Sequence, residues 1–70
     1  MASENYENVR LWFLNDEGLY NMAQRAVRKM GSKDKAAKAI HEDLESVEAL
    51  VLPDGSTMTE SAIRYALRSF

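Results

Sequence analysis

The sequence predicts an all-α fold, a small single-domain bundle of about four short helices. Apolar residues recur at spacings of three and four along most of the chain, as one face of a helix requires. Residues that typically begin or end helices separate these stretches. The 70 residues leave room for one domain, 1–70, and they include no cysteine for a disulfide or thiolate site.

The first two helices are expected at residues 4–14 and from about 17 to Met30. Ser3 can cap the first helix, and Tyr6, Val9, Trp12 and Phe13 form its apolar stripe. Asn15 or Asp16 can accept hydrogen bonds at the start of the second helix, with Glu17 near its positive end. Gly31 favours the left-handed conformation in which many helices end.

The third helix is expected to begin at a cap from Ser32 or Asp34. Its apolar positions keep spacings of three and four over two heptads: Ala37, Ile40, Leu44, Val47 and Val51. This pattern predicts a helix that continues to Val51. Proline and glycine in the segment Pro53-Asp54-Gly55-Ser56 predict a tight turn directly after it.

A fourth helix is expected over residues 58–69. Thr57 and Glu60 have the spacing of a capping box, and apolar residues from Met58 to Phe70 supply one face. The competing interpretation pairs residues 49–52 with 56–59 as a short hairpin around Asp54-Gly55, because valine and threonine favour strands. The sequence leaves this alternative open.

No motif in the chain indicates catalysis, a cofactor or a metal. The segment His41-Glu42-Asp43-Leu44-Glu45 begins like a zinc-protease helix, but Glu45 stands where the second histidine is needed, and the chain has no other histidine. The serines have no nucleophile elbow around them, and the three glycines stand too far apart for a phosphate loop. We therefore expect a protein that is not an enzyme.

Charge is segregated along the chain, although the net charge is only −2. Between positions 25 and 38 there are six basic residues and one acidic residue, whereas between 39 and 60 there are six acidic residues and no lysine or arginine. The basic group could neutralise phosphates, which makes nucleic-acid binding an alternative function. Its residues are Arg25, Arg28, Lys29, Lys33, Lys35 and Lys38. The acidic stretch could instead pair with the basic residues of a second copy or of another protein.

The first helix is apolar over most of its circumference, because Leu11 and Leu14 lie off its main stripe. A chain this small cannot bury every face of such a helix, so a partner groove or a homodimer seam should cover part of it. The expected anchors are Leu11, Trp12, Phe13, Leu14 and Tyr20, beside the polar insert that contains Asp16 and Glu17.

The segment 5–20 resembles the N-terminus of a group of small uncharacterised bacteriophage proteins. The shared elements are Asn5-Tyr6-Glu7, then Asn8-Val9 with Leu11-Trp12, and Asn15-Asp16-Glu17-Gly18-Leu19-Tyr20. Those proteins often carry a Thr-Trp pair before Asn-Val, which this chain lacks. The resemblance implies a phage accessory protein that acts in the bacterial cytoplasm.

Together these observations predict a non-catalytic protein that binds and modulates a host protein. The acidic, polar N-terminus does not have the pattern of a secretory signal. The longest apolar runs have four residues, against roughly 20 for a membrane span. We therefore expect a cytoplasmic location and no membrane partner.

Overall fold

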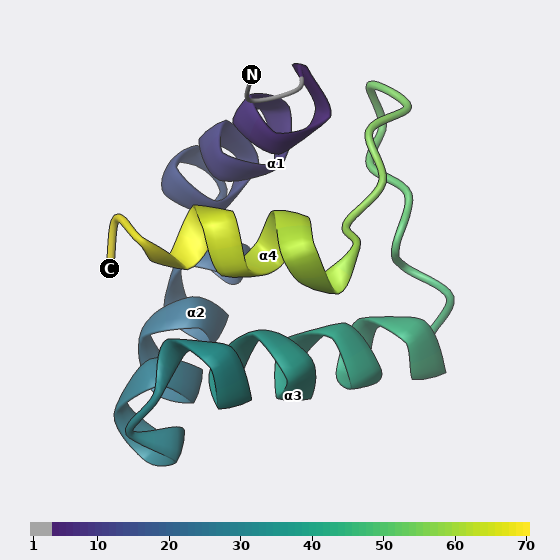
Figure 1. Cartoon of the computed structure of the whole chain (residues 1–70). Coiled ribbons are helices and arrows are strands. Elements are labelled where there is room, and N and C mark those ends of the chain that lie inside the picture. Colours follow the sequence, from purple (N-terminus) through teal and green to yellow (C-terminus); the bar gives the residue numbers. More distant parts are fainter. Residues whose placement is uncertain (1–3) are drawn as a thin grey trace.

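A computed structural model, which describes residues 4–70, confirms a small all-α bundle (Figure 1). Four helices are present in the described residues: α1 (Glu4–Asn15), α2 (Glu17–Met30), α3 (Lys33–Ser46) and α4 (Glu60–Leu67). The helix α4 lies between α1 and α3 and contacts both, although it comes last in the chain. The predicted cap at Ser3 lies outside the described residues.

The boundaries of α2 and the start of α3 follow the predictions. The Asp16 carboxylate accepts a hydrogen bond from the Leu19 backbone N–H at 3.0 Å, which caps α2. At the other end Gly31 has φ +69°, and its N–H donates to the Val27 carbonyl. The Ser32 hydroxyl then accepts from the Lys35 backbone N–H and begins α3.

The predicted continuation of the third helix to Val51 is wrong, because α3 ends at Ser46. Glu48 has φ +54°, and its N–H donates to the Glu45 carbonyl. The next N–H, of Ala49, reaches back to the Leu44 carbonyl at 2.8 Å. These two bonds form a Schellman motif, in which glycine usually occupies the position that Glu48 holds here. The apolar spacing therefore continues to Val51, although the helix ends at Ser46.

Residues 49–59 form the short hairpin that the sequence left as the alternative, around the predicted turn at Pro53–Ser56. An antiparallel bridge pairs Val51 with Thr57. It is flanked by bonds from the Leu52 N–H to the Ser56 carbonyl and from the Met58 N–H to the Leu50 carbonyl, both 2.7 Å. The pairing is one bridge long, so it makes no regular strand.

The fourth helix is shorter than the predicted 58–69, and its predicted capping box does not form. Thr57 belongs to the hairpin, and Thr59 caps α4 by accepting from the Ala62 N–H at 3.1 Å. The Arg68 N–H donates to the Tyr65 carbonyl as the chain leaves the helix. Because Thr57 pairs with Val51 in the hairpin, α4 begins only at Glu60.

The core lies where the four helices and the hairpin meet. The largest fully buried side chains come from α1, α3 and α4: Val9, Phe13, Ile40, Ile63 and Leu67. The hairpin contributes Leu52 and Met58. Because Phe13 is fully buried, the prediction that it anchors a partner is wrong. None of the described helices is both long and apolar enough to span a bilayer.

Candidate protein-binding surfaces

Leu11 and Trp12, two of the predicted partner-binding residues, share one surface hollow. Leu11 is 46% exposed, and with Trp12 and Asn15 it lines a hollow of about 240 Å³ on α1. Leu14 is half-buried and does not line this hollow. The structure therefore brings Leu11 and Trp12 together in one hollow and leaves Leu14 outside it.

Trp12 also holds a contact within the chain. Its indole N–H donates to Oδ2 of Asp54 at 3.1 Å, while the Ser56 backbone N–H donates to Oδ1 at 2.8 Å. The bond from Ser56 and then the bond from Trp12 lower the pKa of the Asp54 carboxyl. The ring of Trp12 is thus fixed beside the turn, which makes the hollow at Leu11 a preformed surface.

The remaining predicted partner residues, Asp16, Glu17 and Tyr20, lie in three different settings. Asp16 caps α2, and Glu17 is exposed in the first turn of that helix. Tyr20 is 37% exposed, and its ring packs against Phe70 with centroids 5.1 Å apart. These two rings, with Gln24, Val27, Arg28 and Ser69, line a hollow of about 360 Å³.

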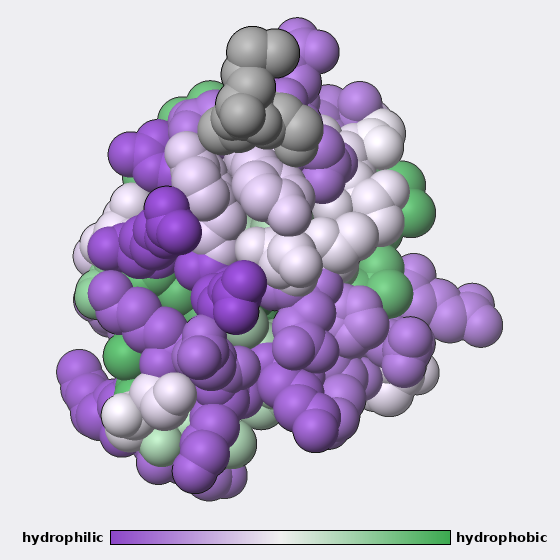
Figure 2. Space-filling view, in the orientation of Figure 1, coloured by the Kyte–Doolittle hydropathy of each residue, from purple (hydrophilic) through white to green (hydrophobic). Residues whose placement is uncertain are grey.

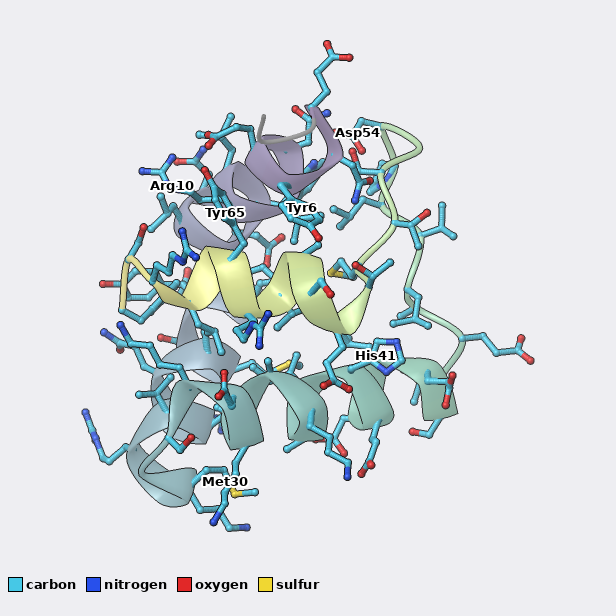
Figure 3. The ribbon with its side chains drawn as sticks, in the orientation of Figure 1. Tyr6, Arg10, Met30, His41, Asp54 and Tyr65 are labelled. Atoms are coloured by element: carbon cyan, nitrogen blue, oxygen red, sulfur yellow. The ribbon has the colours of Figure 1, made fainter. Side chains whose placement is uncertain are left out.

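Polar residues of α1 that the sequence placed on no particular surface join α1 to the hairpin and to α4. Asn5 binds the Thr57 backbone twice: its amide nitrogen donates to the carbonyl at 2.9 Å, and its oxygen accepts from the N–H at 2.8 Å. The Tyr65 hydroxyl donates to Glu7, and the two tyrosines labelled in Figure 3, Tyr6 and Tyr65, pack between α1 and α4. Spacing along the chain carries no signal for such long-range contacts.

The predicted basic residues are all exposed but lie in several places. Arg25 and Lys29 line a hollow of about 340 Å³ together with Asp43, whereas Arg28 belongs to the hollow at Tyr20. The Lys33 ammonium donates to the Arg68 carbonyl at 3.4 Å. Lys35 and Lys38 lie on α3. The six residues therefore belong to two helices, three of them on α2 and three on α3.

Val47, directly after α3, and Val51, in the hairpin, are exposed, although their spacing predicted that they belong to the apolar stripe of the third helix. Val47 is 68% and Val51 67% exposed, the highest values among the large hydrophobic side chains described. In Figure 2 hydrophobic surface is visible at the right-hand margin, where the segment 47–59 runs. Recognising the hairpin in the sequence would have predicted this exposure.

His41 is half-buried on α3 and points toward α4 (Figure 3). In the described part of the chain, no group of three or more histidine, aspartate or glutamate side chains is placed to hold a metal ion. Comparisons with protein-family models, curated proteins and solved structures find no match for this chain.

Proposed function

We propose that this chain is a phage-type accessory protein that binds a host bacterial protein and modulates it without catalysis. The observation that carries the proposal is the hollow at Leu11, Trp12 and Asn15, where an apolar side chain is 46% exposed beside a fixed aromatic ring. Partly exposed aromatic and aliphatic side chains in preformed hollows are typical anchors of protein interfaces. The resemblance of residues 5–20 to phage proteins supports the choice of partner.

The first test is a pull-down of the tagged protein from bacterial lysate, with and without nuclease, read by mass spectrometry. Leu11→Ser removes the exposed apolar side chain and leaves the bond between Trp12 and Asp54 in place. Met30→Ser is the matched control, because Met30 is 39% exposed at the far end of α2. Circular dichroism should show that both variants keep their helical content.

We expect one stoichiometric protein that survives nuclease, is lost with Leu11→Ser and is retained with Met30→Ser. Capture that is equal for the wild type and Leu11→Ser would overturn the assignment of this surface. Failure to capture any protein from lysates of several bacterial hosts would count against the function itself.

The alternative proposal is a small nucleic-acid-binding accessory protein. Arg25 and Lys29, which line the same hollow, are the observation that favours it, although Asp43 in that hollow would repel phosphate. This alternative predicts that nuclease removes every partner and that binding falls steeply as salt rises. Replacing Arg25, Arg28 and Lys29 with glutamine should then abolish binding.

A further inference from the structure

The outer edge of the hairpin at Val51 has unpaired backbone groups. Because the flanking bonds run from Leu52 to Ser56 and from Met58 to Leu50, Val51 and Thr57 are a pair that exchanges no hydrogen bonds directly. Their own N–H and C=O groups therefore point away from each other, toward the two outer edges. Within residues 4–70, no hydrogen bond engages the N–H or C=O of Val51.

The opposite edge shows how these groups are satisfied when a partner is present. There the side-chain amide of Asn5 takes the place of a neighbouring strand, donating to the Thr57 carbonyl and accepting from its N–H. The same pair of backbone groups faces outward at Val51. One edge of the hairpin is thus closed from within the chain, and the other is available to an added strand.

The segment that leads from the end of α3 into the Val51 edge is apolar and acidic. Val47 and Val51 are each about two thirds exposed, and Glu45 and Glu48, which are two residues before and one after Val47 in the sequence, are both exposed. No lysine or arginine occurs between residues 39 and 60. Side chains of an added strand alternate between its two faces, so such a strand can contribute both apolar and charged contacts. Charge complementarity here favours lysine or arginine.

We propose that the Val51 edge binds an extended, basic segment of a partner protein as an added β-strand. The backbone of the segment would pair with the N–H and C=O of Val51, an apolar side chain would cover Val47 and Val51, and basic side chains would face Glu45 and Glu48. This proposal rests on the proposed function, because it names the chemistry of the bound protein. It assigns a contact surface additional to the hollow at Leu11.

The direct test is an NMR titration of the ¹⁵N-labelled chain at low salt with a terminally blocked Lys-Val-Lys-Val-Lys peptide. The expected result is a saturable shift of the Val51 amide signal and its neighbours, weakened by added salt. The matched Glu-Val-Glu-Val-Glu peptide should cause no such shift. Equal responses to both peptides, or no response at Val51 to millimolar Lys-Val-Lys-Val-Lys, would overturn the proposal.

Two substitutions at Val51 separate the backbone contact from the side-chain contact. Val51→Pro removes an N–H that has no partner among the described residues and also replaces the valine side chain with the proline ring, and proline is tolerated at such an outward edge position. We expect it to weaken peptide binding at least about tenfold, since the backbone pairing is lost. Val51→Ala keeps the N–H and should weaken binding only about threefold to tenfold, through lost apolar contact.

A charge variant tests the edge without changing its backbone. The double variant Glu45→Gln and Glu48→Gln should reduce the affinity for Lys-Val-Lys-Val-Lys and flatten its salt dependence. Unchanged affinity in this variant would contradict the basic character of the partner. A Val51 shift that follows the concentration of the protein alone would instead assign the edge to a second copy and overturn the proposal.

The two proposals fail in different ways. If a host protein is captured from lysate and Val51→Pro captures it equally well, the proposed function stands and the Val51 edge is excluded. If the peptide binds at Val51 while no protein is captured from any host lysate, the edge stands and the proposed host function fails. Loss of the captured protein with both Leu11→Ser and Val51→Pro would place both surfaces in one interface.

Discussion

The indole N–H of Trp12 donates to the carboxylate of Asp54 at 3.1 Å, across 42 residues of sequence. The same carboxylate accepts the Ser56 N–H, so one side chain both closes the turn and fastens it to α1. Asn5 makes a second attachment at Thr57. The hairpin, which pairs over a single bridge, is therefore held by α1.

Acid should weaken the contact between Trp12 and Asp54. Hydrogen bonds lower the pKa of Asp54 in the folded state, so the carboxylate contributes stability above its unfolded pKa, near 4, and this contribution is lost as the pH falls through the lower folded pKa. Asp54→Asn lacks the ionisable group and should lose less stability in this range. Urea unfolding at pH 7 and below pH 3, followed by the fluorescence of Trp12, measures the difference. Parallel losses in the two proteins would refute the prediction.

Removing the amide of Asn5 should loosen the hairpin. Asn5→Ala leaves the Thr57 N–H and C=O without their partner, and we expect a loss of about 1–2 kcal/mol in the free energy of unfolding. Amide hydrogen exchange should accelerate at Thr57 more than in α2, which serves as the internal reference. Asn8→Ala, also on α1, is the control variant. Uniform acceleration over the whole chain would argue against a local attachment.

Glycine at position 48 should stabilise the fold. Glu48 has φ +54°, a conformation that costs an ordinary residue roughly 1–2 kcal/mol and that glycine adopts freely. After the greater chain entropy of unfolded glycine is deducted, Glu48→Gly should raise the free energy of unfolding by about 0.5–1 kcal/mol. Glu45→Gly, inside α3, should lower it instead. Denaturation midpoints of the two variants test whether the free energy of unfolding rises in Glu48→Gly and falls in Glu45→Gly.

Glu48→Gly also provides a check on the Val51 edge, because it removes one of the proposed acidic contacts. A variant that is more stable than the wild type yet binds Lys-Val-Lys-Val-Lys more weakly would separate stability from binding at this position. Tighter or equal binding by that variant would show that the carboxylate at position 48 contributes nothing to the edge.

Tyr65 should ionise at a higher pH than a free tyrosine side chain. Its hydroxyl donates to Glu7, and this bond, together with partial burial and the negative charge of Glu7, raises the pKa of the phenol. Because the folded pKa is raised, the associated stability is present below the unfolded pKa, near 10, and is lost as the pH rises through the folded value. Glu7→Gln should bring this titration back toward pH 10. Ultraviolet absorbance of the wild type, Glu7→Gln and Tyr65→Phe assigns the late-titrating group.

Local sequence signals were sufficient for α1, α2 and the start of α3. A helix forms hydrogen bonds between residues four apart, and its caps act within three residues, so the relevant partners are close in the sequence. Asp16, Gly31 and Ser32 each perform the role that their residue types predict. The exposure of Leu11 also followed from its place off the main stripe of α1.

The tertiary structure alone decided where α3 ends, where α4 begins and that Phe13 is buried. The apolar spacing through Val51 suited both a helix and a hairpin, and pairing with Thr57, together with the contacts of Thr57 and Asp54 with α1, favoured the hairpin. Glu48 stands where glycine would have signalled the end of the helix. Burial of Phe13 likewise depends on elements distant in the sequence, because its side chain is covered only when α1 packs against the other helices.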